Sequence, residues 1–410
     1  MPQPGRLDQT ARESGGRIIA ALAAAFRDLD LAEEAYAEAC ARAAAVWPSR
    51  PPRDPAAWLY ATARRAAFDA VRRRGVRGRL APDPPQPPPS VEEAMISDDA
   101  LIPDERLRLI FVCCHPVVPV EVRAPLTLRL VCGLSVREIA RAFLVTEPAM
   151  FQRLTRAKRR IAQSGEPFEI PGPQAWTERL SAVLSTLEVA YAKAHEDAAG
   201  AGAHAGYARE MLALTGALAE LLPDEPECLG LAALVRYAEA RRPARLDETG
   251  AMVPLSEQDP TLWREPLMRQ AERLLRRAAE LDRPGPRQLQ AAIHAVWCGR
   301  KSLAEPPRWG TVLRLYDALL DWRDDAVVRL NRAVALAEIA GPQAALTEVE
   351  GLDPAGLADF APFHALRADL LARLGRAGEA RAAYDRALAL DPGPAERMWL
   401  ERRQSALVMD

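Results

Sequence analysis

Two short helices with a basic outer face are predicted between residues 134 and 162, and such a face could read and anchor DNA. Ser135 precedes the first helix and Thr146 precedes the second, at positions where a hydroxyl side chain caps a helix N-terminus. Pro148 falls in the first turn of the second helix, where its missing N–H is harmless. A pair of helices joined by so short a turn is typical of a helix-turn-helix. In the first helix, the residues expected to face the core are Ile139, Ala140 and Phe143.

The second of these helices divides into an apolar face and a polar face. The apolar residues follow the 3.6-residue period of a helix and are predicted to be core: Met150, Leu154, Ala157 and Ile161. The polar face could reach base edges and phosphates in a major groove. The candidate DNA-contacting residues here are Thr146, Ala149, Gln152, Arg153, Arg156, Arg159 and Arg160. A helical hairpin whose basic face is merely solvated is the alternative interpretation.

A second basic helix is predicted after the proline-rich turn at residues 48–55, in the stretch AWLYATARRAAFDAVRRR. One face is apolar: Trp58, Leu59, Ala63, Ala66, Ala67 and Val71. Arginines gather beyond that apolar periodicity, where packing gives no reason for a cluster: Arg72, Arg73, Arg74, Arg77 and Arg79. Phosphate contact is their favoured interpretation. For Trp58, by contrast, a plain role as a core residue of this helix is the favoured interpretation.

The elements that carry these faces are all predicted to be helical. Alanine and leucine dominate the 410 residues, β-branched and aromatic residues are sparse, and the 35 prolines cluster between segments. Residues 17–46 are expected to form two packed helices with an acidic break at residues 28–30. The fold class is therefore all-α. The expected units are residues 1–80, a linker at 81–104, residues 105–165, and a helical tail at 175–403.

Charge is distributed unevenly along the chain. Residues 1–165 hold 25 Lys and Arg against 19 Asp and Glu, a net charge of +6, which leaves −8 for residues 166–410. The front of the chain is thus the candidate for nucleic-acid binding. The linker is rich in proline and contains only acidic charges, so it could occupy a basic channel or act as a solvated spacer.

The tail contains an internal repeat. In LLARLGRAGEARAAYDRALALDP the small residues and the aromatic residue have the spacing of a tetratricopeptide repeat: Gly375, Ala380, Tyr384, Ala387 and Pro392. Gly341 lies 34 residues before Gly375, which indicates a more degenerate repeat upstream. The tail is therefore expected to stack as an α-solenoid with a concave face.

Several classes of protein are disfavoured by the residues. Cys113, Cys114 and His115 are adjacent but lack a second ligand pair at zinc spacing, so a buried helix end is expected there, with no metal and no cofactor. There is no Gly-rich phosphate loop and no clustered histidine, so no catalytic residue and no enzyme activity are expected. The six cysteines are expected to be reduced thiols. No apolar run approaches the length of a membrane span, which favours a cytoplasmic protein without a membrane partner.

The stretch VREIARAFLVTEPAMFQRLTRAKRRI resembles the fourth conserved region of extracytoplasmic-function RNA polymerase sigma factors, which belong to the sigma-70 family and read the promoter -35 element. The stretches LAEEAYAEACARAAAVWP and DPAAWLYATARRAAFDAVRRR resemble the second region. That resemblance implies promoter-specific initiation of transcription, with core RNA polymerase (its β′ clamp and β flap) and promoter DNA as partners. It also implies that the second region melts the -10 element and captures a flipped base.

The resemblance assigns roles residue by residue. Residues matching the -10 helix are Trp58, Thr62, Arg64, Arg65, Asp69, Arg72 and Arg73. Residues matching the helix that binds the polymerase clamp are Leu31, Glu34, Glu38 and Trp47. Ala37 stands where many relatives have glutamine, and Tyr36 stands where they have a small aliphatic residue.

The subgroup with a long C-terminal tetratricopeptide-like extension is the most similar, through LRLIFVCCHPVV, RPGPRQLQAAIHAV and VVRLNRAVAL. The resemblance then covers residues 15–403, implies no need for a dedicated anti-sigma partner, and leaves a protein or ligand partner of the repeats open. Two other classes stay open. A helix-turn-helix regulator with a tetratricopeptide sensor could act without polymerase, but it leaves the second-region match at residues 31–74 unexplained. A repeat scaffold could touch no DNA, but it leaves both basic helices unexplained.

Overall fold

The computed structural model describes residues 6–77, 105–143, 145–165, 176–197, 205–352 and 354–407. Among these residues every regular element is a helix, apart from one isolated bridge between Leu246 and Met252, which confirms the all-α prediction. The chain divides into two compact units, Met1–Lys193 and Ala194–Asp410. Within the described ranges, no helix is both long enough and apolar enough to cross a membrane.

The first unit begins with three packed helices, α1 (Arg6–Phe26), α2 (Leu29–Val46) and α3 (Pro55–Arg77). Between α1 and α2, Arg27 has a positive φ of 54° and the Asp28 carboxylate accepts a 2.9 Å hydrogen bond from the Leu31 amide. This N-cap confirms the helix break predicted at the acidic residues. The core between α2 and α3 contains Leu31, Ala35, Ala66 and Ala67, with Phe26, Ala70 and Val71 packed against it.

The same unit continues with α5 (Arg106–Cys113), α6 (Val120–Leu130), α7 (Val136–Ala142) and α8 (Glu147–Ser164). Helix α8 packs on α6 and α7, while α1 contacts α5 and α6. Gly16 of α1 lies so close to the end of α6 that a Cβ there would be 1.8 Å from the Val131 carbonyl oxygen. The backbone of α1 therefore packs directly against the backbone at the end of α6. The linker predicted at 81–104 lies outside the described residues.

Helix α9 (Trp176–Asp197) begins the expected tail but belongs for most of its length to the first unit. The Cys114 thiol at the end of α5 donates a 3.3 Å hydrogen bond to the hydroxyl of Thr186 in α9. The division between the compact units thus falls between residues 193 and 194, near the end of α9, and not before residue 175, where the tail was expected to begin.

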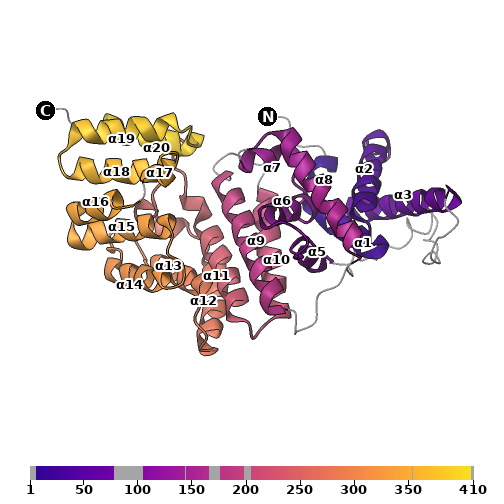
Figure 1. Ribbon diagram of the computed structural model, residues 1–410, viewed down its shortest axis with the longest axis horizontal. Helices are drawn as coiled ribbons and strands as arrows, with labels where there is room; N and C mark the ends of the chain where they lie inside the picture. The colour runs from indigo at the N-terminus through magenta and orange to yellow at the C-terminus, as the bar shows by residue number, and fades with distance from the viewer. Residues whose placement is uncertain are drawn as a thin grey trace. The chain divides into compact units, whose positions relative to one another are not determined.

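The second unit is a chain of helices, each long helix packing against its successor (Figure 1). Its longer helices are α10 (Ala205–Leu221), α11 (Pro226–Arg241), α12 (Glu265–Glu280), α13 (Pro286–Cys298), α14 (Trp309–Leu320), α15 (Ala326–Ala340), α16 (Pro342–Glu350), α18 (Ala361–Arg373), α19 (Ala377–Ala389) and α20 (Pro394–Ser405). A single turn, α17 (Pro354–Leu357), precedes α18. Contacts between neighbours along the sequence are the pattern expected of a solenoid.

The turns α15–α16 and α18–α19 each contain a glycine in the left-handed region, Gly341 at φ 86° and Gly375 at φ 74°. A residue with a Cβ would be strained at either position. Ala380, Tyr384 and Ala387 of α19 are buried in the core that these helices share. The spacing that suggested a tetratricopeptide repeat therefore corresponds to a helical hairpin with small residues at its contact.

A long connection between α11 and α12 reaches the last helix of the chain. Its regular parts are three 3-10 turns, η2 (Arg242–Ala244), η3 (Leu255–Glu257) and η4 (Pro260–Leu262). The Met252 amide donates a 2.9 Å hydrogen bond to the Ala395 carbonyl, and Arg402 of α20 pairs with Asp247 at 2.6 Å. We call residues 245–257 together with α20 the clasp. It joins segments about 150 residues apart in sequence, a contact that a simple linear solenoid lacks.

Candidate nucleic-acid interface

The turn before α7 is fixed by a reciprocal cap. The Ser135 amide donates to the Glu138 carboxylate at 2.8 Å, and the Glu138 amide donates back to the Ser135 hydroxyl at 3.2 Å. This capping box satisfies two helix N–H groups that would otherwise lack partners. Ile139 and Ala140 are buried, as predicted, and Phe143 is half-buried.

Helix α8 begins at the residue that the sequence indicated. The Thr146 hydroxyl accepts a 3.4 Å hydrogen bond from the Ala149 amide, and Pro148 lies in the first turn. All four residues predicted to face the core are buried: Met150, Leu154, Ala157 and Ile161. The two helices and their turn thus have the predicted helix-turn-helix arrangement.

The remaining surface of α8 presents the predicted DNA-contacting residues to solvent. Ala149 is half-buried, and the exposed members are Thr146, Gln152, Arg153, Arg156, Arg159 and Arg160. The Arg156 guanidinium donates a 3.0 Å hydrogen bond to the Gln152 amide oxygen, which places these two side chains on one face. A row of guanidinium groups beside an amide is suited to phosphates and base edges together.

A third face of α8, which the sequence did not single out, lies beside α2. Phe151, Thr155 and Lys158 line a groove with residues of α2, and Phe151 is 60 % exposed. Phe151 and Thr155 are four positions apart, and Thr155 and Lys158 are three apart. Residues at these separations lie on the same face of a helix, so the sequence could have revealed this face. It is distinct from the row of arginines, since Lys158 is turned toward carboxylates of α2.

Helix α3 carries the second basic face. The Asp54 carboxylate caps it by accepting a 2.9 Å hydrogen bond from the Ala57 amide. Most of the predicted apolar face is buried, namely Leu59, Ala63, Ala66 and Ala67, while Trp58 and Val71 are half-buried. The Trp58 ring meets Trp47 edge to face, with centroids 5.6 Å apart. Packing therefore accounts for part of the Trp58 surface and leaves part accessible.

The polar residues of α3 lie along the rest of the helix. Thr62, Arg64 and Arg65 are half-buried, and Arg64 lies over the Phe68 ring at 5.7 Å. Asp69 pairs with Arg72 at 2.6 Å, and the Asp69 carbonyl accepts a 3.2 Å hydrogen bond from Arg73. Arg72 and Arg73 are exposed near the end of the helix. Arg79, which the sequence grouped with them, lies outside the described residues.

The four residues assigned to the clamp-binding helix differ in exposure. Leu31 and Trp47 are buried within the first unit, whereas Glu34 is exposed and Glu38 forms an ion pair with Arg42. In this structure only the two glutamates offer polar atoms to a partner. Ala37 is exposed beside Glu34, while Tyr36 turns toward α1.

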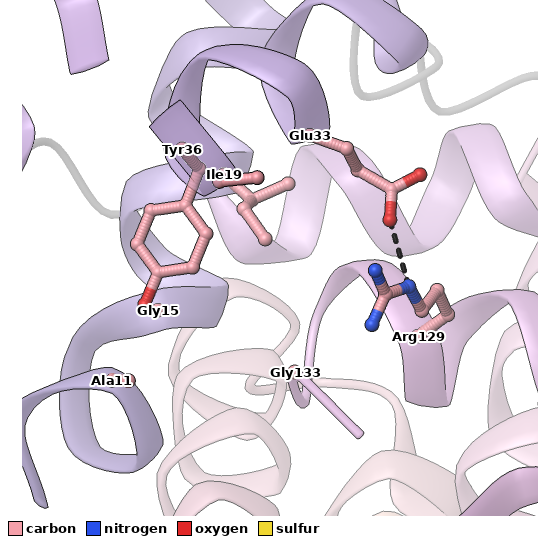
Figure 2. Close-up of a pocket in the computed structure, with 8 residues that line it drawn as sticks. Ala11, Gly15, Ile19, Glu33, Tyr36, Arg129 and Gly133 are labelled. Atoms are coloured by element: carbon pink, nitrogen blue, oxygen red, sulfur yellow. Dashed lines mark hydrogen bonds and ion pairs between the residues drawn. The ribbon is translucent and has the colours of Figure 1, made fainter. Parts of the chain in front are cut away.

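A small cavity of about 250 Å³ lies where α1, α2 and the end of α6 meet (Figure 2). Burial, together with the neighbouring Cys40 thiol, holds the pKa of Tyr36 well above its usual value. A Cβ at Gly15 would lie 2.6 Å from the Tyr36 hydroxyl, so glycine leaves room for this ring. Across the cavity, the Arg129 guanidinium donates a 2.7 Å hydrogen bond to the Glu33 carboxylate.

The adjacent residues Cys113 and Cys114 lie at the C-terminal end of helix α5. Cys113 and Cys114 are buried, and burial raises the pKa of the Cys113 thiol well above its usual value. The His115 ring nitrogen accepts a 3.2 Å hydrogen bond from the Val117 amide, so it shapes the following turn. This is the buried helix end that the sequence favoured. In the described ranges, no group of three or more His, Cys, Asp or Glu side chains could hold a metal ion.

Comparison with known proteins agrees with this geometry. Residues 108–161, which contain α7 and all but the last three residues of α8, match the family described as Sigma-70, region 4. Residues 179–279 match a family of unknown function (DUF6596). An uncharacterized protein of Rhizobium meliloti (strain 1021) is 41 % identical over 415 residues, covering 100 % of this chain and 98 % of its own length. No solved structure matches the chain.

The site and these matches define a DNA-binding protein of transcription initiation with a region 4 helix-turn-helix. Residues 108–161 of the chain are thus a sigma-70 region 4 domain, and over its whole length the chain belongs to the same family as the Rhizobium meliloti protein. Region 4 is a regulatory DNA-binding domain and is not an enzyme family.

Proposed function

We propose that this protein is an extracytoplasmic-function sigma factor that directs core RNA polymerase to specific promoters in the cytoplasm. The observation that carries the proposal is the exposed row of polar and basic residues on α8, within the segment that matches region 4. A sigma factor also explains the second basic helix, α3, which a regulator acting through α8 alone leaves without a role.

The proposal divides the work among three helices of the first unit. Helix α8 reads the -35 element through Gln152 and Arg153 near its beginning and anchors phosphates through Arg159 and Arg160 near its end, since helix-turn-helix proteins place the N-terminal part of the recognition helix at base edges. Helix α3 contacts the -10 element through Arg72, Arg73 and the accessible part of Trp58. Helix α2 offers Glu34 and Glu38 to the polymerase clamp.

The C-terminal helices are proposed to act as a tetratricopeptide-like extension that takes a positive part in transcription, through a protein or ligand that its surface binds. The support is the helical hairpin at Gly375 and the sequential stacking of α10 to α20. The extension is long enough to bind a partner of its own.

The first test is reconstitution with core polymerase. The purified full-length protein is expected to bind core in a pull-down and to support run-off transcription from a promoter with matched -35 and -10 elements. Templates with either element scrambled are the control and should give little product. DNA binding without any binding to core would contradict the proposal and favour a helix-turn-helix regulator that acts alone.

The second test concerns the extension. A truncation after Asp197 keeps all of α9 and removes all but the first four residues of the second unit. It is expected to keep affinity for core and to lose transcription from its own promoter when the two proteins are compared at matched core occupancy. Equal or higher activity of the truncated protein would show that the extension is dispensable or inhibitory.

A further inference from the structure

The strongest unassigned feature is the length of the connection between α11 and α12. These two helices pack directly against each other, and the Arg264 amide donates a 2.9 Å hydrogen bond to the Ala240 carbonyl in the last turn of α11. The connection, residues 242–264, therefore returns to the point at which it leaves. The turns of two later hairpins contain only Gly341 and residues 374–376. A loop that is so much longer than its two helices require is usually functional.

The middle of this connection lies against the first helices of successive hairpins, which are α11–α12, α13–α14, α15–α16 and α18–α19. Leu255 packs on the core shared by α13, α14 and α15. The Arg300 guanidinium, just beyond α13, donates a 3.0 Å hydrogen bond to the Ser256 carbonyl. We call residues 252–257 the inner segment. It crosses the repeats from α13 toward α20.

Helix α15 shows which side of the hairpins the inner segment covers. Arg332 pairs with Asp317 of α14 at 2.7 Å and also with Glu348 of α16, so its side of α15 faces the second helices. Val334 is two residues further on, or about 200° around the helix, and it is 40 % exposed. Val327 is 46 % exposed on the same side. We call this side of the first helices the inner face, and part of its apolar surface is bare.

The inner segment is attached to the inner face by contacts that are open to solvent. The Glu257 carboxylate pairs with Arg403 of α20 at 3.1 Å, and the side chains are 54 % and 43 % exposed. Ion pairs this exposed are individually weak. The residues that follow are different, because Gln258, Pro260 and Trp263 are buried. The inner segment can therefore leave the inner face while the rest of the connection stays anchored.

The inner segment also shows what chemistry the inner face accepts. Pro254 precedes the single turn η3, which is closed by a 2.9 Å hydrogen bond from the Glu257 amide to the Pro254 carbonyl. This turn presents the apolar side chain of Leu255 to the first helices and, two residues later, a carboxylate to Arg403. A similar segment of another protein could satisfy the same groups. If it continued over the bare valines of α15, it would bury more apolar surface than the inner segment does.

We propose that the inner face is a docking site for a short linear segment of a partner protein, in which an apolar side chain is followed two residues later by a carboxylate. The inner segment is an intramolecular ligand that occupies this site until the partner displaces it. The inference rests on the proposed role of the C-terminal helices as an extension that binds a partner. Its test uses no polymerase, so the two proposals can fail separately.

The test weakens the inner segment in the full-length protein and supplies a peptide in its place. The substituted protein carries Leu255→Ser and Glu257→Gln. The control protein carries the same kinds of change at exposed residues of the same connection, Leu262→Ser and Glu248→Gln. The probe is a fluorescently labelled peptide of residues 251–258, and the reference peptide has Leu255→Ser and Glu257→Gln. Circular dichroism establishes that each protein is folded.

Fluorescence anisotropy measures binding of the peptide to each protein. The tethered segment competes at an effective concentration of about millimolar, so the wild type and the control protein should bind the probe weakly. The apparent Kd is the intrinsic Kd divided by the fraction of molecules with an open site. The substituted protein should therefore bind the probe at least about tenfold tighter than either of them. The reference peptide should bind it about tenfold more weakly than the probe does.

A further substitution tests how the carboxylate is recognised. Arg403→Gln, added to the substituted protein, should remove the preference for the probe over a peptide that carries Glu257→Gln alone. Arg276→Gln, at an exposed residue of α12, should leave this preference unchanged. Such a cycle isolates the pairing of the two side chains from other effects of each substitution. A preference that survives Arg403→Gln would overturn the assigned mode of recognition.

Several results would overturn the docking site itself. If the substituted protein binds the probe no tighter than the control protein, or binds both peptides alike, the inner segment is an ordinary connection. A mixed dimer of wild-type and substituted protein in sedimentation would assign the inner face to a second copy of the chain. If the substituted protein does not fold, amide exchange of the wild type decides. Unlabelled peptide at about 1 mM should then speed exchange in residues 245–257, and no change would overturn the proposal.

Failure of the sigma proposal would give a different pattern. The full-length protein would not bind core polymerase, while the substituted protein would still bind the probe tightly. In that case the docking site stands and its partner belongs to another process. Binding to core without any peptide binding would give the opposite result, in which the sigma function stands and the docking site is rejected.

Discussion

The Cys114 thiol donates a hydrogen bond to the Thr186 hydroxyl across 72 residues of chain, and this bond attaches helix α9 to the helix-turn-helix unit. Burial raises the pKa of Cys114 to about 11, so the thiol remains a protonated donor at neutral pH. The first helix of the C-terminal segment is therefore structurally part of the DNA-binding unit.

This attachment predicts where the chain can be cut. A fragment ending at Ser164 is expected to melt below one ending at Asp197, because it lacks α9 and leaves the Cys114 thiol without its acceptor. Loss of one buried hydrogen bond costs about 1 kcal/mol, and each kcal/mol lowers the Tm of a unit this size by about 2–4 °C. Thr186→Val in the longer fragment isolates the bond from the rest of α9. Equal melting of the two fragments by circular dichroism would disprove the prediction.

Base reading and phosphate anchoring should separate along α8. Arg153→Ala is expected to cost about 1–3 kcal/mol of binding on the matched -35 element and to relax sequence preference. Arg160→Ala should weaken all sequences alike and lower the salt slope by about one. Arg276→Ala, at an exposed residue of α12, is the control. Titrations on matched and scrambled elements decide between the roles, and equal losses on both for Arg153→Ala would count against base readout.

The capping box before α7 predicts a specific loss of stability. Ser135→Ala removes the hydroxyl that accepts from the Glu138 amide and is expected to cost about 1 kcal/mol of unfolding free energy. Glu138→Gln preserves an acceptor for the Ser135 amide and should cost less. Urea denaturation of the fragment ending at Asp197 measures both. A larger loss for Glu138→Gln than for Ser135→Ala would mean that charge, rather than capping, stabilises this turn.

The clasp predicts acid sensitivity of the second unit. Hydrogen bonds from Thr249 and Arg402 lower the pKa of Asp247 below its ordinary value of 3.8. A carboxyl whose folded pKa is depressed contributes stability that is present above the unfolded pKa and is lost as the pH falls below it. Asp247→Asn should therefore lower the Tm at pH 7 and flatten its fall between pH 5 and pH 3. Glu248→Gln, at an exposed neighbour, should match the wild type across this range.

The helix-turn-helix could be predicted because its signals are local. Ser135 and Thr146 are caps, and the core residues of α8 repeat at the helical period, so a few neighbouring residues determine each element. The break at Asp28 was predictable for the same reason. The partial burial of Trp58 could not be predicted, since its edge-to-face contact with Trp47 depends on how α2 packs against α3.

The contacts between distant segments left no such signal. Lys158 belongs to the same basic run as Arg159 and Arg160, and only the packing of α8 on α2 turns it toward Glu33, 125 residues away. Gly16 resembles any small residue in an alanine-rich helix until its distance from Val131 is known. Asp247 lies in a connection without periodicity, so its pairing with α20 could not be foreseen.

The clasp changes how the C-terminal helices should lose their structure. In a linear array the end repeats fray first, and each repeat can open with little effect on distant ones. Here α20 contacts residues 245–257. The last helix of the series therefore packs against the segment that precedes α12, and it is not a free terminal repeat. Helices α12 to α20 should consequently unfold in one cooperative step, and removal of α20 should destabilise segments as remote as α11.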